Sequence, residues 1–322
     1  MTANLLLLGY CVAVAAASLL GGFIPHWVRL THTRMQTALS FVAGAMLGVG
    51  LLHLIPHSYF VLGSIDRTMW WALGGFLLMF FIERAFHFHH HGAPEEGESG
   101  EPAGPDHDCA LGHHAHEHHT HAHGGDNSHA HGDDHEHHGG SRQVSWAAAL
   151  LGLALHSLLD GVALAAAVDA EAKQYHDLGL AGLGVFLVVV LHKPFDSLTL
   201  GTLMAVGGRS ARHRHLVNLS YALAVPCGAL LFHFGLLSLA GDNTRIVGYA
   251  LALAAGTFLC IATSDLLPEL QFHTHDRFRL SAALLLGLAL AGAIVFLEEH
   301  GHDHHAHEQQ PPLSSSAPVT AR

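Results

Sequence analysis

Charge is scarce in this 322-residue chain, because only 12% of its residues are Asp, Glu, Lys or Arg, whereas about 25% is usual for soluble domains. The 14 Lys and Arg residues are outnumbered by 26 Asp and Glu, which excludes a basic nucleic-acid-binding protein. The four cysteines include no C-x-x-C pair. No strand pattern is present, and half of the residues are apolar. This composition also excludes a disordered chain and an ordinary soluble enzyme.

Eight apolar runs approach the length of about 20 residues that a membrane-spanning helix needs. They predict an all-α polytopic membrane protein with eight transmembrane helices. Nine arginines fall in the loops after odd-numbered spans and four Lys or Arg residues on the opposite side, so the positive-inside rule places both termini outside. We place the spans at residues 4–24, 37–61, 68–86, 144–168, 178–206, 216–240, 244–267 and 279–297.

The polar segments divide the chain into four parts. Residues 1–86 carry transmembrane helices 1–3, residues 144–297 carry helices 4–8, and residues 298–322 form a histidine-rich external tail. Between helices 3 and 4, residues 87–143 hold 17 of the 34 histidines. This segment is low in complexity and cannot bury a core, so we expect a disordered cytoplasmic loop whose neutral imidazoles bind metal.

Two helices carry ionisable side chains where the membrane should be most apolar. His156 and Asp160 lie in the fourth span, and His192 and Asp196 lie in the fifth. An ionisable group near mid-bilayer costs about 2.5–3.5 kcal/mol and normally faces a partner or cavity. Each His and Asp are four residues apart and share a helix face. Two such faces suit Zn²⁺ or a related divalent metal, whereas the simpler alternative is one intramembrane hydrogen bond in each helix.

Lys193 and Pro194 lie inside the fifth-span group. Lys193 is three residues from Asp196, and we interpret it as a fixed internal charge that offsets the aspartates; a lysine that reaches toward the membrane surface is the alternative. Proline removes a helical N–H. Pro194 therefore indicates either a broken-helix binding site or a proline that a transmembrane helix simply tolerates.

Two further groups could mark the ends of a metal pathway. His53 and His57 lie four residues apart toward the outer end of the second span and predict an entrance, unless they are interfacial histidines beside a proline kink. Asp265 and Glu269, at the inner end of the seventh span, could form an exit, although acids at a helix end are ordinary.

These residues resemble the ZIP (Zrt/Irt-like) family of divalent metal transporters. The segment from His156 to Gly161 (HSLLDG) is similar to the family's fourth-span signature H-N-x-x-[DE]-G, and the segment from His192 to Asp196 (HKPFD) to the fifth-span signature H-[ED]-x-P-[HE], in the form of the subgroup with an LHK motif. The resemblance implies a metal site at His156, Asp160, His192 and Asp196. It implies no second, bridged metal, since Ser157 and Lys193 replace ligands of that site.

The resulting prediction is a transporter that moves a divalent metal into the cytoplasm, with Zn²⁺ as the foremost candidate, and that has no cofactor and no enzymatic activity. Fe²⁺, Mn²⁺ and Cd²⁺ stay open as cargo, because ligand type alone does not set selectivity. An intramembrane metal-dependent hydrolase and a metal sensor without transport are the alternatives. We expect metal ions and the lipid bilayer as partners, no nucleic acid, a plasma or inner membrane location, and leave a homodimer open.

Overall fold

A computed structural model describes residues 2–23, 31–86, 146–174, 181–237, 244–272 and 277–306. They belong to one compact unit formed by residues 1–88 and 144–322. Within these ranges every regular element is helical. The predicted loop at 87–143 and the end of the predicted tail, residues 307–322, lie outside the described residues.

Eight helical segments are long and apolar enough to cross a membrane, which confirms the predicted polytopic architecture. Six segments are single helices, namely α1 (Ala3–Gly21), α5 (Ile65–Phe86), α6 (Trp146–Gln174), α7 (Leu183–Val206), α11 (Arg245–Phe272) and α12 (Arg277–Ala306). The second combines α3 (His32–Gly48), the π-helix η1 (Val49–Leu54) and α4 (Ile55–Leu62), and the sixth combines α8 (Ala211–Ala222), α9 (Ala224–Leu230) and the π-helix η3 (Leu231–Leu236).

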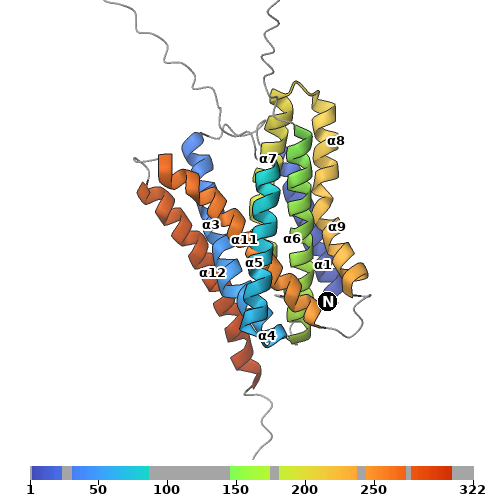
Figure 1. The fold of residues 1–322 in the computed structure, drawn as a ribbon, viewed down its shortest axis with the longest axis vertical. Coiled ribbons are helices and arrows are strands. Elements are labelled where there is room, and N and C mark those ends of the chain that lie inside the picture. Colours follow the sequence, from blue (N-terminus) through green and yellow to red (C-terminus); the bar gives the residue numbers. More distant parts are fainter. Residues whose placement is uncertain are drawn as a thin grey trace, which may run out of the picture. The chain divides into compact units, whose positions relative to one another are not determined.

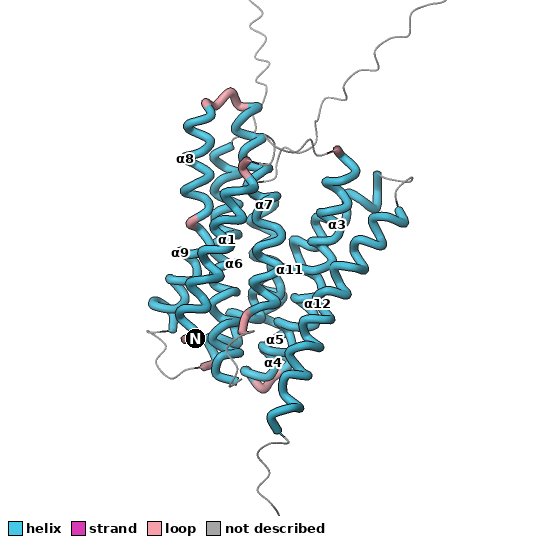
Figure 2. The backbone as a smooth tube through the Cα atoms, turned by 180° about the vertical axis from the view of Figure 1, so that it is seen from behind, coloured by secondary structure: helices cyan, strands magenta, loops and turns pink. Residues whose placement is uncertain are grey.

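The helices form two groups that lie side by side. One group contains α1, α6, α7, α8 and α9, and the other contains α3, α4, α5, α11 and α12 (Figures 1 and 2). Helix α6 joins them, since it packs on α9 in its own group and on α11 and α5 in the other. The second group therefore lies against the helix that carries His156 and Asp160.

Glycines allow close helix packing within each group. A Cβ on Gly161 of α6 would overlap the backbone of Val225 in α9, and a Cβ on Gly228 of α9 would overlap the backbone of Leu158 in α6. Contacts of this kind between small residues bring membrane helices to short axial distances. The same reciprocal arrangement joins α5 to α11 through Gly75 and Gly256, and α3 to α12 through Gly44 and Gly287.

Pro194 does not interrupt its helix. Helix α7 runs continuously from Leu183 to Val206, so the broken-helix alternative is wrong and the tolerated proline is the correct reading. The backbone of Pro194 packs directly against Gly21 of α1, where any side chain would overlap it. The irregular backbone lies instead at η1, which contains His53; π-helical turns of this type often accompany functional residues.

Candidate metal centre

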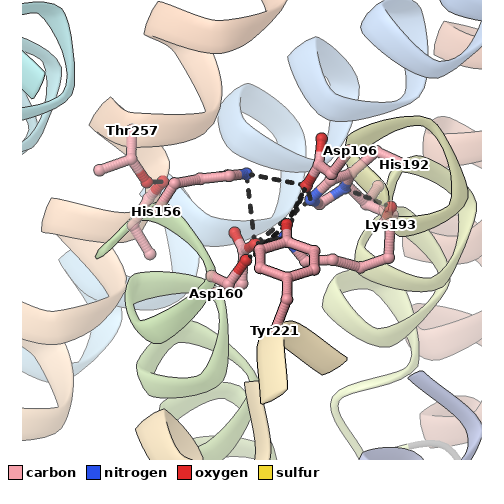
Figure 3. Close-up of polar contacts among 10 residues, drawn as sticks. His156, Asp160, His192, Lys193, Asp196, Tyr221 and Thr257 are labelled. Atoms are coloured by element: carbon pink, nitrogen blue, oxygen red, sulfur yellow. Dashed lines mark hydrogen bonds and ion pairs between the residues drawn. The ribbon is translucent and has the colours of Figure 1, made fainter. Parts of the chain in front are cut away.

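Helices α6 and α7 bring their four ionisable residues to one place. His156 and Asp160 are one turn apart on α6, and His192 and Asp196 are one turn apart on α7. The two imidazole rings approach each other with centroids 5.4 Å apart (Figure 3). His156, Asp160 and His192 are 3%, 1% and 5% exposed, so the group is almost completely removed from solvent.

One carboxylate oxygen, Asp160 Oδ2, lies between the two rings. It is 3.4 Å from His156 Nε2 and 3.2 Å from His192 Nε2. Two ligands of one tetrahedral zinc ion, each about 2.1 Å from the metal, are about 3.4 Å apart. Asp160 Oδ2 is therefore as far from each imidazole nitrogen as two ligands of one ion are from each other, and one donor atom from each of the three residues lies within 4.8 Å of the others.

Asp196 lies at the edge of this group. Its Oδ2 atom is 3.8 Å from His156 Nε2 and 4.0 Å from His192 Nε2, slightly too far to share an ion without a small side-chain movement. The side chain is 18% exposed, in contrast to the 1% of Asp160. Asp196 is thus the most accessible member of the four.

The hydrogen bonds of His192 and Asp160 leave atoms that could bind a metal directed into the centre. His192 Nδ1 lies 2.8 Å from the carbonyl oxygen of Val188; a carbonyl can only accept, so Nδ1 carries a proton, and the neutral ring that binds a metal then presents the lone pair of Nε2. Metal-binding histidines are commonly held in this way. Asp160 Oδ1 is buried and has no hydrogen-bond partner among the described residues. Buried polar atoms rarely lack a partner, so this oxygen fits a further ligand.

Lys193 places a positive charge beside the two carboxylates. Its Nζ atom lies 2.6 Å from Asp160 Oδ2 and 2.9 Å from Asp196 Oδ2, and it donates to Ser157 Oγ at 3.0 Å. The side chain is 1% exposed, so it does not extend toward the membrane surface. Lys193 and Ser157 were predicted to stand where the family has ligands of a second metal, and in the structure Lys193 Nζ lies between the two carboxylates.

Tyr221 of α8 is a polar member of the centre that the sequence did not predict. Its hydroxyl donates to Asp196 Oδ2 at 3.0 Å and accepts from Ser157 Oγ at 2.8 Å. Figure 3 shows the ring rising from α8 toward Lys193 and Asp196. A single tyrosine in an apolar helix carries no periodic signal that would distinguish it.

A second group of possible ligands lies toward the far end of α6. His53 Nε2 is 2.9 Å from Glu171 Oε1, and the rings of His53 and His57 have centroids 4.5 Å apart. Glu171 Oε2 accepts from the backbone N–H of Gly182 at 2.7 Å. One donor atom from each of the two histidines and Glu171 lies within 4.8 Å of the others. The structure therefore adds Glu171, which the sequence did not predict, to the predicted entrance.

The predicted exit cannot be placed in the same way. Asp265 and Glu269 belong to α11 (Arg245–Phe272), but their side chains lie outside the part of the chain that the structure describes. The same holds for the side chains of the histidine-rich segment His300–Glu308.

Eight apolar helices around a buried group of histidines, carboxylates and one lysine define a polytopic membrane protein with a site suited to a divalent cation. The family model described as ZIP zinc transporter matches residues 4–296. The chain therefore belongs to the ZIP zinc transporter family, which confirms the resemblance carried by the fourth and fifth spans.

Individual relatives agree with this assignment. The chain is 31% identical over 166 residues to zinc transporter ZIP9-B of Xenopus laevis, covering 48% of this chain and 52% of that protein. It is 28% identical over 276 residues to zinc transporter ZIP4 of Homo sapiens, covering 75% of this chain and 39% of that protein. The chain thus spans about half the length, or less, of these two relatives.

Proposed function

We propose that the protein moves a divalent metal ion across the membrane into the cytoplasm, with Zn²⁺ as the foremost candidate. The ion passes through the site of His156, Asp160, His192 and Asp196. The observation that carries this proposal is the spacing of 3.2–3.4 Å between Asp160 Oδ2 and the two Nε2 atoms in a buried site. Imidazole and carboxylate donors suit zinc and its neighbours among the transition metals. The ion is cargo, and the site needs no cofactor.

Lys193 makes this a site for one ion at a time. Two carboxylates and one ammonium leave a single net negative charge in the absence of metal, and the ammonium occupies the space between Asp160 and Asp196. A second cation there would meet an immobile like charge. Lys193 also holds both carboxylates in position between transport events, so the empty site keeps its geometry.

The group of α1, α6, α7, α8 and α9 is suited to carry the ion as a rigid body. The residues that surround the proposed ion all belong to it, since they come from α6, α7 and α8. The predicted entrance, formed by His53, His57 and Glu171, instead takes its residues from both helix groups. His53 and His57 come from the other group, whereas Glu171 comes from α6. Movement of one group against the other would therefore separate Glu171 from the two histidines and open the entrance.

The rest of the pathway follows from the predicted orientation of the chain. The external tail would collect metal and pass it to the predicted entrance, and Asp265 and Glu269 would receive it on the inner side. The histidine-rich loop at 87–143 would then bind it in the cytoplasm. Binding must be weak enough for exchange at each step, and the longer distances of 3.8 and 4.0 Å from Asp196 Oδ2 to the two histidines are consistent with that need.

The geometry argues against an intramembrane hydrolase. Such an enzyme would need a donor to stabilise the oxyanion of its substrate, and Lys193 is the cation nearest to the proposed ion. An ammonium has three N–H donors. Asp160, Asp196 and Ser157 accept all three, which leaves none for a substrate.

Zinc uptake by liposomes tests the proposal. Purified protein reconstituted around a zinc-sensitive dye should give protein-dependent influx, and Asp196→Ala should abolish it while the protein remains folded and inserted. The matched control is Asp169→Ala, which removes a carboxylate of the same helix bundle that pairs with the exposed Lys173 and should keep the wild-type rate. Binding of zinc without influx would support a sensor, and undiminished influx in Asp196→Ala would exclude the four-ligand site.

A further inference from the structure

A cavity of about 110 Å³ lies between α7, the first turns of α8 and the residue that follows α1; along α7 it extends from Ser197, the residue after Asp196, to Ala205, near the turn that joins α7 to α8. This volume is well above the roughly 10–15 Å³ that one water needs. The apolar part of its wall comes from Leu198, Leu200, Met204 and Ala205 of α7, and its polar part from Ser197 and Thr202 of α7 and from Arg214, His215 and Asn218 of α8. Figure 1 shows the short turn that connects the two helices.

Two buried polar atoms at the cavity have no hydrogen-bond partner among the described residues, Arg214 Nε and Asn218 Oδ1. Asn218 is 8% exposed, and its Nδ2 atom donates to the carbonyl oxygen of Leu19 at 3.3 Å, which fixes the amide so that Oδ1 is the unused atom. The cavity therefore offers an ionic donor beside a neutral acceptor. A ligand that satisfies both needs an anionic group and a hydroxyl or similar donor next to it.

Basic side chains of the turn before α8 and of its first turns contact aromatic rings. The Arg209 guanidinium lies 5.1 Å from the centroid of the Trp146 ring, a distance typical of a cation–π contact. The His215 ring stacks on Phe23 with centroids 5.1 Å apart. Within the described ranges no carboxylate pairs with Arg209, Arg212 or Arg214. Of these, Arg214 lines the cavity and is available to an anion there.

The surface around the cavity places the cavity at the boundary between lipid and water. Val206, the last residue of α7, is 89% exposed, and Leu216 and Leu219 of α8 are also exposed, as expected where helices face lipid tails. The positive-inside rule puts the same arginines on the cytoplasmic side. Basic pockets between membrane helices on that side are suited to lipid head groups.

We propose that this cavity binds the head group of an anionic phospholipid that carries a free hydroxyl. Arg214 contacts the phosphate, Asn218 Oδ1 accepts from the head-group hydroxyl, and the apolar wall covers the first carbons of the lipid. A free phosphate ion shares the anionic chemistry but gains nothing from the apolar wall. Because the lining comes from α7, α8 and the residue that follows α1, Gly22, the bound lipid would tie three helices of the site-bearing group together.

Native mass spectrometry of the full-length protein tests the proposal, using phosphatidylglycerol and phosphatidylcholine of equal chain length as probes. We expect phosphatidylglycerol to be retained in preference to phosphatidylcholine and not to be displaced by millimolar inorganic phosphate. Arg214→Gln should lower the apparent affinity for phosphatidylglycerol by about tenfold or more, since it removes a charged hydrogen-bond donor.

A second variant tests the cavity itself and does not depend on charge. A Cβ on Gly201 meets nothing within 4 Å, so Gly201→Phe should fill the cavity and displace the lipid without disturbing the backbone. Gly292→Phe on α12, where a Cβ also meets nothing within 4 Å, is the control for size, and Arg67→Gln on α5 is the control for charge. Equal retention of both lipids, displacement by phosphate, or unchanged retention in Arg214→Gln and Gly201→Phe would each overturn the proposal.

Discussion

Replacement of Lys193 by methionine should tighten zinc binding. Lys193 Nζ lies 2.6 Å from Asp160 Oδ2, so an ion about 2.1 Å from the same oxygen is at most about 4.7 Å from the ammonium. At that distance and an effective dielectric constant of about 20, a unit charge and a divalent ion repel each other by about 7 kcal/mol. Proton uptake by the unpaired carboxylates offsets much of this gain. We therefore expect an affinity increase of at least about tenfold.

The same change should destabilise the protein in the absence of zinc. Removing one partner from a buried ion pair costs about 3–5 kcal/mol, because the remaining charge is left without compensation. Lys193→Met should thus melt at a lower temperature than wild type without zinc, gain more from added zinc, and transport more slowly because release is slower.

Thermal melting across a zinc titration, together with competition against a zinc-chelating dye, measures both effects. Lys173→Met is the matched control, since that lysine is 57% exposed and pairs with Asp169 at 2.7 Å on the surface, an arrangement worth at most about 1 kcal/mol. A folded Lys193→Met protein with unchanged or weaker zinc affinity would refute the placement of the ammonium beside the ion.

Three further outcomes are expected. Tyr221→Phe removes the hydroxyl that donates to Asp196 and should slow zinc uptake about fivefold, corresponding to about 1 kcal/mol for one hydrogen bond; an unchanged rate in liposomes would exclude a role for that contact. Glu171→Gln should raise the zinc concentration for half-maximal uptake several-fold while the maximal rate is kept, and a loss of maximal rate alone would contradict its place at the entrance. Deletion of residues 87–140 should leave transport intact but alter its response to metal supply in cells, whereas a folded yet inactive deletion would make the loop part of the pathway.

The eight-helix architecture could be predicted because hydropathy and length are local properties of the chain. The i, i+4 spacing likewise predicted which faces of α6 and α7 would carry the histidines and aspartates. In the structure these faces meet at Asp160, and Lys193 lies between the two carboxylates.

Features that depend on contacts between distant residues were not predictable. Tyr221 reaches Asp196 from another helix, and Glu171 meets His53 across a separation of 118 residues. Neither has a periodic partner in its own helix. The close packing of Gly21 of α1 against the backbone of Pro194 in α7 is likewise a contact between distant residues. Sequence spacing describes one helix at a time and leaves these contacts undetermined.

The central claim is that one ion is held jointly by α6 and α7. Zinc influx into dye-loaded liposomes, measured in parallel for His156→Ala and His192→Ala, tests it most directly. His233→Ala, which removes an intramembrane imidazole that packs against Phe234 instead, is the control. The account predicts that both site variants lose influx and that the control keeps it. Influx that persists in either site variant would contradict an ion shared by the two helices.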